Sequence, residues 1–209
     1  MRTSSTVYES GPLRDVTGTT IRPGGLMLTD RALAHCSFAA GAQLLDVGCG
    51  AGASVEHLRS RYGFDARGVD ISSTLIAEGL RRNPDLLLSE AEAEAVPYPD
   101  ESHDGIICEC VLSLLTEPLR ALTEFRRLLR SGGYLILSDM YRREPATGQP
   151  EAWLSENGFT MLLWEDHTHL LRELAARLIL ANGSLEGLCC RAPGSGRKPG
   201  YYLLVAHKD

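Results

Sequence analysis

The chain has 209 residues, 44% of them hydrophobic and 23% charged, so it is long enough to bury one sizeable core. Its formal net charge of −6 argues against a nucleic-acid partner, because binding to a phosphate backbone depends on clustered Lys and Arg. No apolar stretch reaches membrane-spanning length, and the polar first residues lack the apolar region of a signal peptide. We therefore expect a soluble, cytoplasmic, single-domain protein that binds neither nucleic acid nor membrane and is a monomer or homodimer.

The first two thirds of the sequence alternate between predicted strands and helices. Residues 1–25 are polar and glycine-rich, and helical spacing of apolar residues predicts a leading helix over residues 26–38. Strands are then expected at residues 43–47, 66–71, 86–89, 105–109 and 134–138. Helices are expected between them at residues 53–61, 73–82 and 118–130. Apolar strands that alternate with helices indicate a parallel sheet covered on both faces, and so an α/β fold.

The last third has a different pattern. It predicts a short helix near residues 150–156, a strand at 159–164, a long helix at 168–180 and a final strand at 201–207. The two late strands are expected to form an edge pair added to the parallel sheet.

The most informative stretch is residues 43–52, where an apolar run ends in Asp46 and three glycines then alternate with small residues. A strand that stops in a glycine-rich turn and opens a helix lets a ligand approach the backbone and the helix N-terminus. The next apolar run ends in Asp70, roughly 20 residues on, where a nucleotide-binding βαβ unit places its ribose-binding carboxylate. The stretch therefore predicts a nucleotide-like ligand.

These and later motifs resemble the class I S-adenosylmethionine (SAM)-dependent methyltransferases, in their ubiquinone- and menaquinone-biosynthesis branch. The matching segments are D-x-G-x-G-x-G at 46–52, Asp70, the loop at 92–98, S-H-D-G-I-I at 102–107 and E-F-R-R-L-L-R-S-G-G at 124–133. The resemblance implies a Rossmann-like, seven-stranded, mostly parallel sheet with an antiparallel last strand and helices on both faces. It also implies a leading helix or lid at residues 1–41 and a methyltransferase domain at 42–209.

The resemblance also implies a set of cofactor-binding residues. These are Asp46, Gly48, Cys49, Gly50, Gly52, Asp70, Ile71, Glu92, Ala93 and Glu109. The glycines would hold the amino-acid tail of SAM, Asp70 the ribose, and Glu92 with the Ala93 amide the adenine, although relatives usually have Asp where this chain has Glu92. Two other interpretations stay open: the glycines could serve only tight packing, and Asp46 could be a structural acid that holds loop amides.

The methyl acceptor is expected to be a small molecule, since a methyl on sulfonium needs little more than alignment with a nucleophile and exclusion of water. Three residues at the ends of the fourth and fifth strands are candidates for the acceptor site. They are Glu109, as a general base, Cys110 and Tyr141. No bound metal is predicted, because no C-x-x-C pair occurs.

The cysteines suggest an alternative function. Residues 108–114 and 138–141 resemble segments of arsenite methyltransferases, in which thiolates bind trivalent arsenic. Cys108 and Cys110 are two residues apart and would share a face if the strand continued, yet each could equally be a buried apolar residue. A metalloid or thiol methyltransferase would have to complete its site with Cys189 and Cys190, since no cysteine lies between Cys110 and that pair.

Two further classes are considered. A dehydrogenase would space its glycines as G-x-G-x-x-G, but here Gly52 falls one residue early and position 53 is Ala. A domain that binds SAM without turnover, as a sensor or scaffold, is compatible with the same motifs.

Overall fold

The structure is a computed structural model, and it describes residues 6–142, 154–183 and 199–209. Seven strands form one sheet: β1 (Gln43–Val47), β2 (Asp65–Asp70), β3 (Leu88–Glu90), β4 (His103–Glu109), β5 (Leu129–Arg142), β6 (Phe159–Asp166) and β7 (Pro199–Lys208). Their order across the sheet is β3-β2-β1-β4-β5-β7-β6. β7 pairs antiparallel with both β5 and β6, and the other pairings are parallel. The predicted fold class is confirmed.

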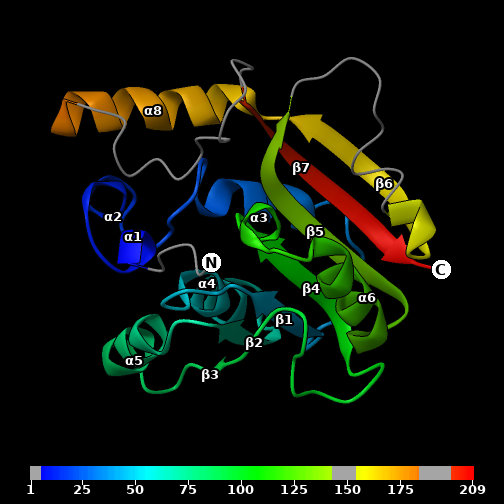
Figure 1. The fold of residues 1–209 in the computed structure, drawn as a ribbon. Coiled ribbons are helices and arrows are strands. Elements are labelled where there is room, and N and C mark those ends of the chain that lie inside the picture. Colours follow the sequence, from blue (N-terminus) through cyan, green and yellow to red (C-terminus); the bar gives the residue numbers. More distant parts are fainter. Residues whose placement is uncertain (1–5, 143–153, 184–198) are drawn as a thin grey trace.

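Helices lie on both faces of this sheet (Figure 1). They are α1 (Thr6–Glu9), α2 (Pro12–Thr17), α3 (Leu26–Leu33), α4 (Ala53–Tyr62), α5 (Ser73–Arg82), α6 (Pro118–Leu128) and α8 (Thr168–Asn182), with a 3₁₀ turn, η1, at Leu112–Leu114. One core cluster joins the sheet to α6, and a second joins its other face to α3, α4, α5 and α8. Ser72 caps α5 by accepting from the Leu75 amide at 3.2 Å, as a helix N-terminus requires.

Two helix ends differ from the sequence prediction. α3 stops at Leu33 instead of residue 38, and α6 stops at Leu128, before the Gly132-Gly133 pair. The backbone leaves α6 early because the Ser102 amide donates to the Leu128 carbonyl at 2.9 Å and Lys208 donates to the Leu129 carbonyl at 2.6 Å. These partners, far away in the sequence, extend β5 by five residues at its start relative to the predicted strand. The helix predicted near residues 150–156 lies mostly outside the described residues.

The carboxyl ends of β1, β2 and β4 meet at one edge of the sheet, where the strand order reverses between β1 and β4. Open α/β sheets bind ligands in the crevice at such a point. α1 and α2 contact both α5 and α8 near this edge. Ser72, the cap of α5, donates to Glu9 of α1 at 2.7 Å, and Arg14 of α2 pairs with Glu78 of α5. Leu13 of α2 packs against α8. The leading segment therefore bridges α5 and α8 beside this edge of the sheet (Figure 1).

Candidate functional site

The three glycines after β1 have different neighbours, although all have positive φ angles: 80° at Gly48, 54° at Gly50 and 78° at Gly52. A Cβ at Gly48 would lie 2.1 Å from the Val111 side chain, and one at Gly52 would lie 2.8 Å from Leu88. A Cβ at Gly50 would have no neighbour closer than 3.9 Å. Gly48 and Gly52 thus serve close packing, whereas Gly50 faces open space that a ligand could enter.

Asp70 ends β2 and is tied to the same loop. Its carboxylate accepts from the Gly50 amide and from the Ser72 amide, each at 2.8 Å. Burial raises the pKa of Asp70, and these amide hydrogen bonds act in the opposite direction. The neighbouring Ile71 side chain is 61% exposed, unusual for a residue so apolar. A fixed carboxylate beside an exposed apolar side chain suits a ribose with a flat base next to it.

Cys49 differs from the other residues of the loop. Its thiol packs into the core against Gly68, and burial raises its pKa well above the ordinary value. Only its backbone could meet a ligand, so the predicted role of Cys49 is limited to its main-chain groups.

Asp46 is a buried acid, 4% exposed, below the loop. Burial raises its pKa to about 7; Glu109 and Asp70 add to this rise, and Arg22 opposes it. A carboxyl group with that pKa changes charge near neutral pH, and groups of this kind are concentrated at functional sites.

Glu109, at the end of β4, is held by side chains from three distant parts of the chain. Arg22 forms an ion pair with it at 2.9 Å, Thr29 of α3 donates at 3.0 Å and Ser138 of β5 donates at 3.2 Å. The exposed fractions of the paired side chains are 10% for Arg22 and 2% for Glu109. Its carboxylate is therefore already occupied by three donors, an arrangement that suits holding charge in place better than abstracting a proton.

Sequence reasoning placed Arg22 only within a leading segment, residues 22–27, that could cover the cofactor as a lid, and gave it no role of its own as a site residue. Its guanidinium also donates to Thr29 at 2.8 Å and to Ser54, at the start of α4, at 3.0 Å. Burial lowers the pKa of Arg22, but the carboxylates of Glu109 and Asp46 outweigh it and leave the pKa raised. The available signal was weak: a lone arginine in a predicted turn, directly before Pro23 and two glycines.

Cys108 and Cys110 do not share a face, because the strand on which that expectation depended ends at Glu109. Cys108 is buried in the α6-side cluster, whereas Cys110 packs against the opposite cluster. The strand ends at Glu109, and Cys110 takes a φ of 58°, which turns its side chain away from the strand pattern. Its sulfur lies 3.1 Å from the hydroxyl of Tyr201, which donates to Ser138 at 3.2 Å. A chain of polar contacts therefore runs from Cys110 through Tyr201 and Ser138 to Glu109.

Glu92 and Ala93 lie in the loop that follows β3. The Ala91 amide donates to the Asp70 carbonyl at 3.0 Å, which places this loop beside the Asp70 carboxylate. Ala93 is buried in the core, while the Glu92 side chain is exposed. The structure thus brings together the loop, Asp70 and the Glu92–Ala93 segment along one edge.

Tyr141 has its contacts on another part of the sheet. Its hydroxyl donates to Asp166 of β6 at 3.0 Å, and its ring packs edge-on against Trp164 and Tyr202. A Cβ at Gly200 would lie 2.3 Å from the same ring. Tyr141 therefore belongs to the β5-β7-β6 end, and its predicted role at the acceptor site stays a prediction.

The described thiol and histidine side chains do not gather into a metal site. Within residues 6–142, 154–183 and 199–209, no group of three or more His, Cys, Asp or Glu side chains could hold a metal ion. His167 is instead paired with Glu165 at 2.9 Å, and Glu165 with Arg31 at 2.6 Å. Cys189 and Cys190 lie outside the described residues.

Part of the chain matches a known protein family, and the whole fold matches solved structures. Residues 45–137 match the family model described as a methyltransferase domain. A demethylmenaquinone methyltransferase from Renibacterium salmoninarum is 33% identical over 99 residues, which cover 47% of this chain and 41% of that protein. The resemblance to class I SAM-dependent methyltransferases is confirmed. The chain spans only about half the length, or less, of the first curated relatives it matches, 52% and 41%.

Two solved structures share the fold. A Haemonchus contortus phosphoethanolamine N-methyltransferase 2 bound to SAM matches with a TM-score of 0.77 at 15% identity, over 100% of this chain and 58% of that one. The [4+2]-cyclase SpnF matches with a TM-score of 0.72 at 24% identity, over 87% of this chain and 80% of that one. At these identities the likeness concerns the fold alone. Across the described part of the chain, no helix is long and apolar enough to cross a bilayer.

Proposed function

We propose that this protein is a SAM-dependent methyltransferase that moves the methyl group of SAM to a small-molecule acceptor by in-line displacement. One observation carries the proposal: at the strand-order reversal, the open space at Gly50 adjoins a carboxylate, Asp70, that two backbone amides hold in place. The match of residues 45–137 to a methyltransferase domain supports SAM as the cofactor.

The residues present fit the parts of SAM. Asp70 would accept from the ribose hydroxyls, Ile71 would pack on the base, and Glu92 with the Ala93 amide would meet the adenine edge. The buried charges near the ends of β1 and β4 fit the amino-acid tail: Asp46 of β1 and Glu109 of β4 suit its ammonium group, and Arg22, which precedes α3, suits its carboxylate. When bound, SAM supplies a methyl group already activated by its sulfonium charge.

The chain's own contribution to the reaction is positioning. Glu109 is 6% exposed and bound by three donors, which favours a role in holding the cofactor tail over its predicted role as a general base. Cys110, one residue further, contacts Tyr201, which connects it through Ser138 to Glu109, and the acceptor is proposed to enter beside Cys110. Alignment and exclusion of water then account for most of the catalysis.

The alternatives receive no support from the described residues. Cys108 and Cys110 belong to opposite clusters, so they do not form a pair of thiolates for arsenic. The likeness to a cyclase shows that this fold can host other chemistry, and a domain that binds SAM without turnover is therefore an outcome to test. The expected cytoplasmic location and the monomeric or homodimeric state stay predictions.

The test begins with calorimetric titration of the purified protein with SAM, S-adenosylhomocysteine and NADH. We expect the first two to bind and NADH not to, and Asp70→Ala to weaken SAM binding by roughly tenfold or more. Binding of NADH in place of SAM would overturn the family assignment of the site.

The acceptor is then sought with methyl-labelled SAM. Reduced demethylmenaquinone and phosphoethanolamine represent the acceptors named by relatives, and arsenite with excess glutathione tests the metalloid alternative. Labelled arsenic that disappears with Cys110→Ser would make this a metalloid enzyme. SAM binding with no labelled product from a broad acceptor panel would favour a non-catalytic role.

A further inference from the structure

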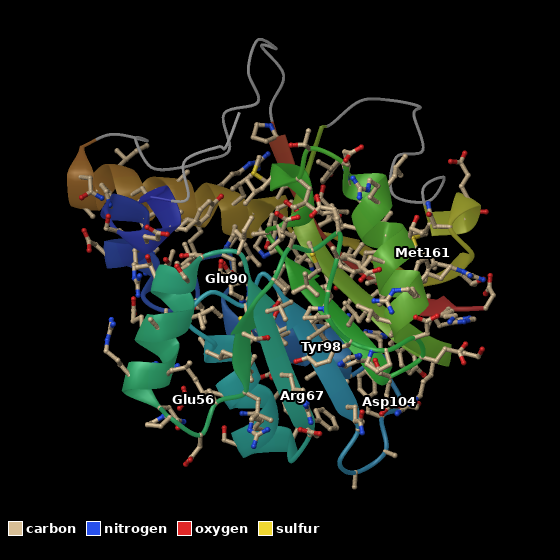
Figure 2. The ribbon with its side chains drawn as sticks, turned by 60° about the horizontal axis from the view of Figure 1, so that its bottom comes forward. Glu56, Arg67, Glu90, Tyr98, Asp104 and Met161 are labelled. Atoms are coloured by element: carbon tan, nitrogen blue, oxygen red, sulfur yellow. The ribbon has the colours of Figure 1, made fainter. Side chains whose placement is uncertain are left out.

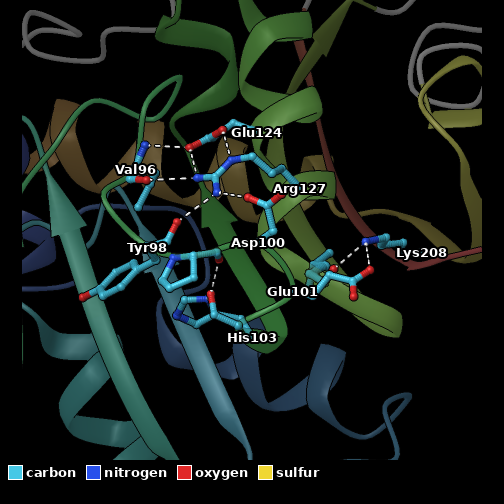
Figure 3. A network of polar contacts seen from close by, with 11 residues as sticks. Val96, Tyr98, Asp100, Glu101, His103, Glu124, Arg127 and Lys208 are labelled. Carbon is cyan, nitrogen blue, oxygen red and sulfur yellow. Dashed lines mark hydrogen bonds and ion pairs between the residues drawn. The ribbon is translucent and has the colours of Figure 1, made fainter.

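The loop between β3 and β4, residues 91–102, is fastened to α6 by one arginine. Figure 3 shows the Arg127 guanidinium at the centre of this network. Its contacts are Nε to Glu124 at 2.8 Å, Nη1 to the Tyr98 carbonyl at 2.9 Å and to Asp100 at 2.6 Å, and Nη2 to the Val96 carbonyl at 3.1 Å and to Glu124 at 2.7 Å. These contacts use all five N–H donors that a guanidinium has.

Glu124 completes the attachment from the opposite direction. Besides its two-pronged contact with Arg127, it accepts from the Val96 amide at 2.8 Å. The side chain of Glu124 is 12% exposed and that of Arg127 is 32% exposed, so both are shielded by the loop that they bind. The paired fork fixes direction as well as distance, which a single ammonium group could not do.

The other end of the loop is attached to the backbone of Asp70, the residue whose carboxylate is the candidate ribose ligand. Ala91 donates to the Asp70 carbonyl, and the Ala95 amide closes a turn on the Glu92 carbonyl at 3.2 Å. Val96 is 3% exposed and packs, together with Ala93, into the α6-side core. The turn that carries Glu92 is therefore held on one side by β2 and on the other by Arg127.

The loop is also supported by the start of β4. The Tyr98 ring packs edge-on against His103, with 5.0 Å between ring centroids, and Figure 2 shows Tyr98 beside the end of β4 that carries Asp104. The Glu101 amide donates to the Arg127 carbonyl at 2.9 Å. The position of the turn is thus set by α6, although α6 itself contributes none of the proposed cofactor contacts.

We propose that Arg127, oriented by Glu124, is a positioning residue for recognition of the adenine: it fixes the turn that presents Glu92 and the Ala93 amide to the base. This inference rests on the proposed function. A turn held before binding avoids the loss of conformational freedom on binding, and it keeps the Glu92 carboxylate where an exocyclic amino group can donate to it.

The experiment compares S-adenosylhomocysteine with S-inosylhomocysteine, whose base carries an oxygen in place of the amino group. Calorimetry gives both dissociation constants for the wild type, for Arg127→Met and for Arg126→Met. Arg126 is the matched control, because it lies on the same helix, is exposed, and approaches Gly158 and not the loop. We expect the wild type to prefer the adenine ligand by about tenfold or more, since the inosine oxygen would face a carboxylate.

With Arg127→Met, we expect binding of the adenine ligand to weaken about tenfold and binding of the inosine ligand far less, so that the preference falls toward unity. The KM for SAM should rise by a similar factor while kcat stays within about twofold. Arg126→Met should match the wild type in both ligands. A purely structural role would weaken both ligands together and leave the preference unchanged, which would overturn the inference.

Other outcomes are equally decisive. Failure of the wild type to bind either ligand would refute the proposed function itself, whereas a wild type that binds both equally would refute only the role of Glu92 in adenine recognition and the inference with it. If Arg127→Met does not fold, Arg127→Lys answers the same question. It keeps the charge and cannot reach all five acceptors, so an unchanged preference would again count against the inference.

Discussion

Two carboxylates at the ends of β2 and β4, the strands on either side of β1, are held in different ways. Asp70, after β2, is bound by the backbone amides of Gly50 and Ser72. Glu109, after β4, is bound by the side chains of Arg22, Thr29 and Ser138. The first arrangement is made almost entirely within one βαβ unit. The second is assembled from the leading segment, α3 and β5.

The difference separates two kinds of site. Backbone amides hold Asp70 in place whichever side chains surround it, so that part of the site needs only glycine and a strand end at the right spacing. The Glu109 cluster depends on tertiary packing, because a buried charge is stable only while its partners remain. We expect changes near Asp70 to affect binding mainly, and changes near Glu109 to affect folding as well.

The largest expected effect is that of Arg22→Met. Methionine keeps much of the apolar stem but leaves Glu109 buried without its cation, and breaking a buried ion pair costs about 3–5 kcal/mol. We expect a loss of that size in the free energy of unfolding, measured by urea denaturation. The double variant Arg22→Met with Glu109→Gln removes both charges and should recover a large part of the loss.

If Arg22→Met lowered the free energy of unfolding by less than about 1 kcal/mol, the range of an exposed ion pair, Glu109 would not depend on its side-chain partners as we propose. Arg31→Met provides that reference on α3, since the side chain of Arg31 is 51% exposed in its pair with Glu165. A change there should be close to neutral, and equal effects for the two variants would mean that the Glu109 cluster is not a structural unit.

The second prediction separates ligand binding from packing within the glycine loop. Gly50→Ala adds a methyl group that meets no protein atom within 3.9 Å, so its stability cost should be limited to the positive φ, about 1–2 kcal/mol. Gly48→Ala would collide with Val111 and should cost about 3 kcal/mol. We expect Gly50→Ala to weaken SAM binding by about tenfold or more in calorimetry, since the added methyl group would occupy space that we assign to the cofactor.

Gly48→Ala is the matched variant, because it should cost more stability than Gly50→Ala but less SAM affinity. A Gly48→Ala protein that stays folded at low temperature should bind SAM better than Gly50→Ala does, despite being less stable. The opposite ranking would show that Gly50 faces no ligand.

The Asp70 region and the Glu109 cluster also differ in how well the sequence predicts them. The strands, the order of elements, the glycine loop and Asp70 were predictable because apolar periodicity and glycine spacing are local properties. Arg22 was not, since nothing near residue 22 in the sequence indicates that residue 109 will be its partner. The early end of α6 was missed for the same reason, as Ser102 and Lys208 are distant in sequence.

Cys110 shows a further limit of sequence patterns. Strand alternation predicts its direction only while the strand continues, and a non-glycine residue with positive φ cannot be read from composition. Tyr201, which contacts Cys110 and Ser138, lies in β7, and the sequence predicted only that it would be part of a strand. The positions of the glycine loop and Asp70, the proposed cofactor half of the site, were therefore predictable, and the side-chain network at β4 required the structure.

The third prediction concerns this network. Tyr201→Phe removes the hydroxyl that contacts Cys110 and donates to Ser138, but it leaves the Arg22–Glu109 ion pair intact. Loss of one buried hydroxyl of this kind should cost about 1.5 kcal/mol of unfolding free energy. SAM affinity should change by less than about threefold. A large loss of SAM binding without loss of stability would instead place Tyr201 at the cofactor itself.

The smallest predicted effect is a pH dependence that arises where the two regions meet. Asp46 faces Glu109, Arg22 and Asp70, and burial raises its pKa to about 7 in the free protein. Because the folded pKa lies above the unfolded value, the folded state binds the extra proton between about pH 4 and 7. This group's contribution to stability therefore falls as pH rises through that range.

Cofactor binding should respond in the opposite direction. The ammonium and sulfonium charges of SAM favour the ionised form of Asp46, so binding requires loss of its proton below pH 7. The ionised fraction rises from about one tenth at pH 6 to about nine tenths at pH 8, which predicts roughly tenfold tighter binding at the higher pH. Calorimetry in buffers of different ionisation enthalpy should also detect the released proton at pH 6. Asp46→Asn should bind SAM more weakly and with no such slope; if the slope persisted in that variant, another group would be responsible, and Asp46 would be a structural acid of the Glu109 cluster.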